Sequence, residues 1–70
     1  MSSNWVLLSS YKREYQSALL AAALEERGIQ YKMVDKVDSA FTFMGEIEVY
    51  VRRSEFVTAR RLKEKLENNE

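Results

Sequence analysis

The hydrophobic positions of the chain follow two different periods, and each change of period marks the border of an expected element. A short apolar run with polar flanks, "NWVLLS", predicts a mostly buried strand over residues 4–9. Strict alternation in "IQYKMVDK" and in "EIEVYVR" predicts half-buried strands over residues 29–36 and 46–52. The residues of the last strand that are expected to face the core are Ile47, Val49 and Val51.

A helical period occupies the segments between and after these strands. The residues that recur at i, i+3, i+4 and i+7 in the first such segment are Ser17, Leu20, Ala21 and Leu24. They predict a helix over residues 11–27 that lies against a core. Ser10 is expected to cap its start, and Gly28 has the position of the left-handed residue that ends it. A narrower apolar stripe predicts a second helix over residues 55–67, with Ser54 as its cap.

The order strand, helix, strand, strand, helix predicts one domain, residues 1–70, of the α+β class. A right-handed crossover places the first two strands parallel, and the third strand fits between them, antiparallel to both. The result is a ferredoxin-like β-α-β-β-α two-layer sandwich, with a three-stranded sheet in the order 1-3-2 and both helices on one face. It corresponds to a split β-α-β-β-α-β unit without its last strand.

This topology predicts which connections meet at each end of the sheet. The turn that contains Ser10 and Tyr11 is expected at the same end as the loop over residues 37–45, and Arg52 and Arg53 at the opposite end. The loop is unusually apolar for a connection between two antiparallel strands. Its large apolar residues are Phe41, Phe43 and Met44. They either cap the small core, form a partner or self-association surface, or line a small-molecule pocket.

Composition removes several classes of chemistry. The chain has no Cys and no His, which excludes disulfides, Cys or His zinc sites and triads that depend on His. No cofactor, metal site or catalytic residue is predicted, and we expect a protein that is not an enzyme. Eleven basic and eleven acidic residues cancel, so no long-range field attracts nucleic acid. Without a signal peptide or a membrane-spanning segment, the expected location is the cytoplasm.

The face of the sheet away from the helices, called the outer face below, is a second candidate surface. Tyr50 is expected there beside Val34 and either Trp5 and Leu7 or Val6 and Leu8. RNA-recognition modules stack bases on such aromatics, but Glu46 and Glu48 flank Tyr50 and would repel phosphates. A half-apolar face beside an open edge strand favours pairing with a second copy instead.

A weaker candidate is the sequence "VRRSEF". Arg52, Arg53 and Ser54 precede a helix start, where guanidinium and backbone N–H groups can hold an anion. The alternative is two solvated arginines at a strand end.

The pattern as a whole resembles a known family. Leu24, Glu25, Gly28 and Ile29 form the helix ending "Leu-Glu-x-x-Gly-Ile", a variable loop and the Val-rich strand "IEVYV" follow, and the last helix has Ala and Leu on its inner face. This resembles a small bacterial domain family of unknown function that is labelled as prokaryotic signal-transducing proteins. Its members commonly have more proline around the loops than this chain, which has none. The resemblance implies an α+β sandwich similar to PII-like and ferredoxin-like regulatory folds, and it implies no catalytic residue.

These observations predict a non-catalytic cytoplasmic regulatory or adaptor module that acts through protein–protein contacts, with signal transduction as its setting. An unknown protein partner and a homodimer through the edge strand or the open sheet face are expected, without nucleic acid or membrane. The residues expected to form the surface are Phe41, Phe43, Met44, Tyr11, Ser10 and Tyr50. The alternative is a small-ligand sensor for an amino acid or nucleotide, with Ser10 and Tyr11 facing the loop.

Overall fold

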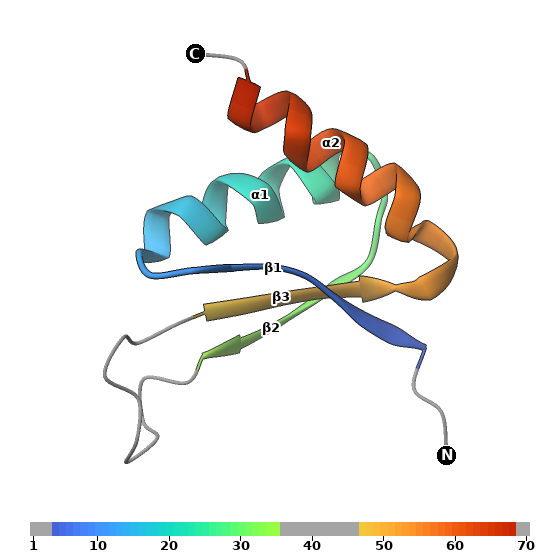
Figure 1. The fold of residues 1–70 in the computed structure, drawn as a ribbon, viewed down its shortest axis with the longest axis horizontal. Helices are drawn as coiled ribbons and strands as arrows, with labels where there is room; N and C mark the ends of the chain where they lie inside the picture. The colour runs from blue at the N-terminus through green and yellow to red at the C-terminus, as the bar shows by residue number, and fades with distance from the viewer. Residues whose placement is uncertain (1–3, 36–46, 69–70) are drawn as a thin grey trace.

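The computed structural model describes residues 4–35 and 47–68 of the chain, and these residues form a two-layer α+β sandwich (Figure 1). The elements are β1 (Trp5–Tyr11), α1 (Glu14–Glu26), β2 (Tyr31–Asp35), β3 (Ile47–Arg52), a short 3₁₀ helix η1 (Arg53–Glu55) and α2 (Phe56–Asn68). The three strands form one sheet in the order β1-β3-β2. The predicted ferredoxin-like β-α-β-β-α topology is therefore confirmed.

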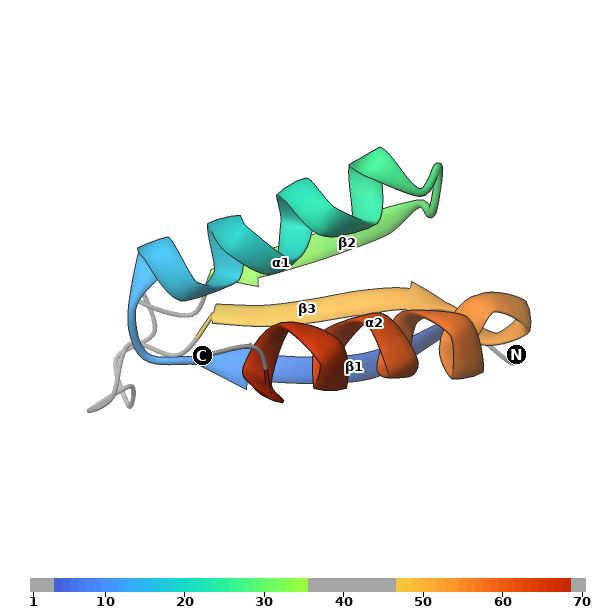
Figure 2. The ribbon, with the colours of Figure 1, turned by 90° about the horizontal axis from the view of Figure 1, so that it is seen from above.

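Both helices lie on the same side of the sheet, as Figure 1 shows. Figure 2, which looks onto the helical layer, places α1 over the β2 side and α2 over the β1 side, and the two helices run in opposite directions. No described element covers the other side of the sheet. The outer face that the sequence predicts is thus present.

The central strand β3 is antiparallel to both of its neighbours. Val51 lies opposite Val6 on one side and opposite Tyr31 on the other. The register of β1 shifts between Leu7 and Ser9, so that the strand has a bulge there. Because β3 is the central strand, β1 and β2 are both edge strands of the described sheet.

The core lies between the inner face of the sheet and the two helices. Its buried cluster consists of Leu20, Leu24, Ile29, Val49, Val51 and Ala59. All four residues of the predicted α1 stripe are buried, as are the three predicted inward-facing residues of β3. Burying side chains of this size stabilises a fold by roughly 1.5–3 kcal/mol each relative to their exposed state, which makes these few residues decisive for so small a domain.

The C-terminus of α1 has the hydrogen bonds of a Schellman motif. Gly28 has a φ of +72°, its N–H donates to the Glu25 carbonyl at 3.0 Å, and the Ile29 N–H donates to the Leu24 carbonyl at 2.9 Å. Ile29 and Leu24 belong to the same buried cluster, which adds the apolar contact that commonly accompanies this motif. The prediction that Gly28 ends the helix is confirmed.

The predicted cap of α1 is wrong. Ser10 belongs to β1 and lies opposite Glu48, because the strand ladder continues as far as Tyr11 and holds Ser10 in extended backbone. The helix begins at Glu14 instead of near residue 11, and its N-cap residue Arg13 makes no side-chain cap hydrogen bond.

The predicted cap of α2 is also wrong. Ser54 lies inside η1, and the α-helix begins only at Phe56. The chain passes directly from β3 into this 3₁₀ turn, where the Arg53 N–H donates to the Asn4 carbonyl at 2.6 Å. This bond ties the turn to the start of β1 and holds Ser54 inside η1, two residues before α2 begins.

β2 begins later than predicted, and the predicted last residue of this strand, at position 36, lies outside the described residues. The strand begins at Tyr31 and not at Ile29, because the Schellman motif uses the backbone of Ile29 to close α1. The predicted loop over residues 37–45 and position 46 lie outside the described residues.

Candidate functional site

The strand register decides which residues of β1 share the outer face with Tyr50. Leu7 lies opposite Tyr50, and Trp5 lies opposite Arg52. Lys32 lies opposite Tyr50 on the other side, and Val34 lies opposite Glu48. The pair Trp5 and Leu7 is therefore on the outer face, and the alternative pair Val6 and Leu8 is not, since Val6 pairs with buried Val51 and Leu8 packs against the core.

An aromatic and cationic cluster occupies one end of the outer face. The Trp5 ring centroid lies 4.9 Å from the Arg52 guanidinium carbon and 5.5 Å from the Lys32 ammonium nitrogen. Both distances are within the range of cation–π attraction. The Arg52 Nε also donates to Gln30 Oε1 at 2.9 Å, which fixes the guanidinium between the ring and the amide. Trp5 comes from β1, Arg52 from β3 and Lys32 from β2, and Gln30 directly precedes β2.

Tyr50 occupies the middle of the outer face, on the central strand. Its hydroxyl donates to Glu48 Oε1 at 2.7 Å. This hydrogen bond to a carboxylate raises the pKa of the Tyr50 phenol above 10.0, with smaller contributions from partial burial and from the negative charge of Glu48. The Tyr50 ring therefore stays neutral over the physiological range, and its hydroxyl is oriented along its own strand.

The outer face also exposes aliphatic side chains. Leu7 is 45% exposed and Val34 is 36% exposed, although both are large apolar residues on a sheet. Together with the two aromatic residues and the two cations they form what we call the outer-face patch, which consists of Trp5, Leu7, Lys32, Val34, Tyr50 and Arg52. A patch of this composition is typical of a contact surface, because its apolar area is water-exposed in the isolated chain.

The remaining predicted site residues lie elsewhere. Ser10 is on the outer face opposite Glu48, and Tyr11 packs against the core opposite Ile47. Phe41, Phe43 and Met44 lie outside the described residues, and their predicted role as core cap or contact surface stays a prediction. Tyr11 and Asp35 both lie opposite Ile47. The end of β1, the end of β2 and the start of β3 therefore lie at the same end of the sheet, as the topology predicts.

The predicted anion site at "VRRSEF" is divided between two environments. Arg52 points over the outer face toward Trp5 and Gln30, whereas Arg53 and Ser54 are exposed in η1. The three residues are adjacent in sequence, but the Arg52 guanidinium already has two partners. The anion site stays a prediction, and Arg53 and Ser54 are the two of its three residues whose side chains are exposed.

Sequence reasoning missed a basic cleft on the helical layer. Arg27, Thr58, Arg61, Leu62 and Lys65 line a hollow of about 230 Å³ between the end of α1 and the middle of α2. The signal in the sequence is the pair Arg61 and Lys65, two like charges at i and i+4 on the predicted second helix.

Two observations hold for residues 4–35 and 47–68. Within these ranges, no three acidic, His or Cys side chains come together in a group that would hold a metal ion. The helices described there are also not long and apolar enough to cross a bilayer.

Comparisons of the chain with protein-family models, with curated proteins and with solved structures gave no match.

Proposed function

We propose that this chain is a non-catalytic cytoplasmic regulatory or adaptor module that acts through protein–protein contacts. The observation that carries the proposal is the composition of the outer-face patch. Trp5, Tyr50 and Arg52 lie together there, and these three residue types are the ones enriched among the energetically dominant residues of protein interfaces.

The physical argument is the cost of leaving this patch in water. Leu7 and Val34 flank the aromatic residues and remain exposed because no described element covers this side of the sheet. Burying apolar area against a partner contributes roughly 25 cal/mol per Å² before the costs of association. Lys32 within the patch and Glu48 beside it give a partner charges by which to set its orientation.

A second copy of the chain is the partner that we propose first. The chain has no net charge, so two copies do not repel one another at long range. The patch reaches edge strand β1, whose segment Trp5–Tyr11 has no charged residue and no proline to oppose pairing with another strand. The predicted contribution of Phe41, Phe43 and Met44 belongs to the same proposal, as does the setting in signal transduction that the family resemblance implies.

Sedimentation equilibrium tests this proposal directly. We expect the wild-type chain to dimerise reversibly at high micromolar concentration, and Leu7→Glu to shift it to monomer. Leu19→Glu is the matched control, because Leu19 is 61% exposed on α1, in the opposite layer. A wild-type chain that stays monomeric contradicts self-association, and equal effects of the two substitutions contradict the outer face as its surface.

A small-ligand sensor is the second candidate, and one observation favours it. Tyr11 lines a hollow of about 250 Å³ together with Tyr15, Gln16 and Leu20 of α1 and the end of α2. A ligand that binds the folded chain must raise its melting temperature. A thermal-shift screen of amino acids and nucleotides separates this candidate from the first, because a contact module without a pocket ligand gains no stability from any of them.

A further inference from the structure

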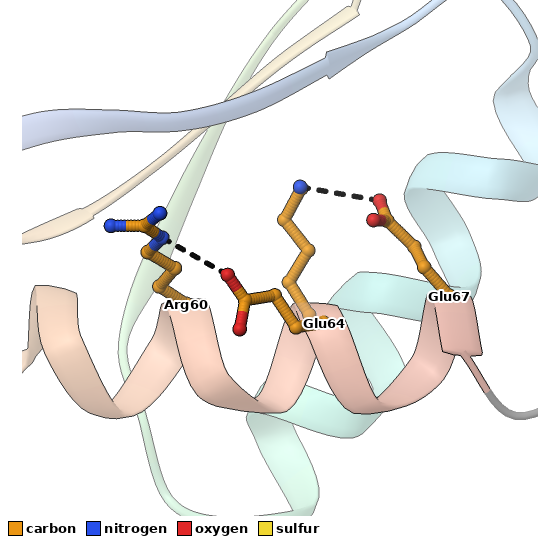
Figure 3. A network of polar contacts seen from close by, with 4 residues as sticks. Arg60, Glu64 and Glu67 are labelled. Atoms are coloured by element: carbon orange, nitrogen blue, oxygen red, sulfur yellow. Dashed lines mark hydrogen bonds and ion pairs between the residues drawn. The ribbon is translucent and has the colours of Figure 1, made fainter.

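The basic residues of α2 divide into two sets. Arg60 pairs with Glu64 at 3.2 Å and Lys63 pairs with Glu67 at 3.2 Å, both at i and i+4 (Figure 3). Arg61 and Lys65, on another face of the same helix, form no ion pair with any residue that the structure describes. They are instead i and i+4 to each other, where like charges repel.

A third cation meets this unneutralised pair. Arg27, the residue that caps the C-terminus of α1, lines the same hollow of about 230 Å³ as Arg61 and Lys65. Arg27 has a structural explanation, since a cation near the last carbonyls of a helix is favourable. The same explanation applies to Lys65, which lies in the last turn of α2, but it does not apply to Arg61, which lies in the middle of that helix. Positive charge from two helices therefore converges on one hollow.

The hollow continues into an apolar one. Leu62, Lys65, Leu66 and Asn68 line a second hollow of about 430 Å³, and Leu62 and Lys65 belong to both. Leu66 is 40% exposed there. We call the combined feature the α2 groove. It follows α2 from Thr58 to Asn68, which at the helical rise of 1.5 Å per residue is roughly 15 Å.

From these features we infer that the α2 groove binds a segment of a partner protein in which acidic residues adjoin apolar ones. The carboxylates of the partner segment contact Arg27, Arg61 and Lys65, and its apolar side chains pack against Leu62 and Leu66. Arginine binds carboxylates in paired, charge-assisted hydrogen bonds, which makes an acidic segment the complementary occupant. A single small anion would use only the basic end and would leave Leu66 in water.

This inference goes beyond the proposed function, because it concerns the helical layer and not the outer face of the sheet. Figure 1 shows α2 on the side of the sheet away from the outer face. The failure of one therefore leaves the other standing, and sedimentation of each variant reports on the outer face separately.

Fluorescence anisotropy with synthetic peptides tests the inference. The probes are fluorescein-labelled twelve-residue peptides with a block of glutamates and a block of leucines and phenylalanine, in both block orders, and a version with lysine in place of glutamate. We expect saturable binding of at least one glutamate peptide by the full chain, weaker binding as salt rises, and no binding of the lysine peptide.

The chain offers a matched pair of variants. Arg61→Gln with Lys65→Gln removes the two groove cations, and Arg60→Gln with Lys63→Gln removes two cations of the same types from the same helix. We expect the first variant to weaken peptide binding roughly tenfold and the second to change it less than about twofold. Leu66→Ser should weaken binding without changing its salt dependence.

Circular dichroism melting confirms that each variant folds. The inference is overturned if neither glutamate peptide binds saturably, if the lysine peptide binds equally well, or if the two double variants weaken binding to the same extent.

Discussion

Trp5 and Arg52 lie directly opposite each other on β1 and β3, and the Arg52 guanidinium carbon is 4.9 Å from the centroid of the Trp5 ring. This cross-strand pair joins an edge strand to the central strand on the side that no described helix covers. The cation–π attraction favours the orientation of the Trp5 ring that faces the guanidinium. Trp5 is also the only tryptophan of the chain, so its fluorescence reports on this contact.

We expect Arg52→Met to lower the free energy of unfolding by about 0.5–1 kcal/mol, because the substitution removes the guanidinium from the Trp5 ring and from Gln30. Urea denaturation followed by Trp5 fluorescence measures the change. Arg53→Met is the control, since Arg53 is exposed in η1, and it should stay within about 0.5 kcal/mol of wild type. Equal losses for both variants would mean that the Trp5–Arg52 contact contributes nothing.

Leu20→Ala and Leu24→Ala should each lower the free energy of unfolding by roughly 2–5 kcal/mol, because both side chains are almost completely buried against β3. A loss of this size is comparable with the whole stability of a small domain. Leu19→Ala tests the assignment of faces on α1, since Leu19 is mostly exposed and should change stability by less than about 0.5 kcal/mol. Thermal melts that rank Leu19 with the other two would contradict this arrangement.

Gly28→Ala should destabilise the chain by about 1 kcal/mol, because residue 28 has a left-handed φ of +72° that a Cβ makes unfavourable. The Cβ itself would meet no atom within 4 Å, so the loss comes from the backbone and not from a clash. Gly28→Asn should lose less, since Asn tolerates this conformation better. Chemical denaturation of the two variants checks the order, and an Asn variant that is less stable than the Ala variant would refute the explanation.

Glu48→Gln should lower the pKa of the Tyr50 phenol toward 10.0, because the carboxylate that accepts its hydrogen bond is the main cause of the raised value. The raised pKa also makes the stability of the fold depend on pH. The folded pKa lies above the unfolded one, so the contribution of Tyr50 is fully present below pH 10 and is lost as the pH rises through the folded pKa.

NMR titration of the Tyr50 ring carbons measures this pKa in the folded chain. Glu55→Gln is the control, and it should leave the Tyr50 titration unchanged. A Tyr50 pKa that does not respond to Glu48→Gln would show that the hydrogen bond is absent in solution. Tyr31 offers a parallel case, since its hydrogen bond to Glu25 is the main cause of its raised pKa.

Local patterns in the sequence predict most of the fold. The helical spacing of Leu20 and Leu24 identifies the buried side of α1, and the alternation of Val49 and Val51 identifies the inner face of β3. Both patterns work because burial repeats with the period of the element itself. Gly28 is predictable for the same local reason, since few residues adopt its backbone conformation.

Helix starts are not predictable from these patterns. Ser10 has the side chain of a cap, but the ladder with β3 keeps it in β1. Ser54 also has such a side chain, but the 3₁₀ turn that bonds to Asn4 places it before the start of α2 proper. In both cases a bond to a residue distant in sequence outweighs the local preference, which is worth only about 1 kcal/mol.

The candidate site also has features that local sequence predicts and features that only long-range contacts decide. The sequence by itself determines the element types, the inner faces of the helices and of β3, and the absence of Cys and His chemistry, because these depend on residue identity and on short-range period. Only the tertiary structure decides that Trp5 and Leu7 share a face with Tyr50, and that Arg27 lies with Arg61 and Lys65. Register and helix packing set those neighbours, and both are fixed by contacts between segments far apart in the chain.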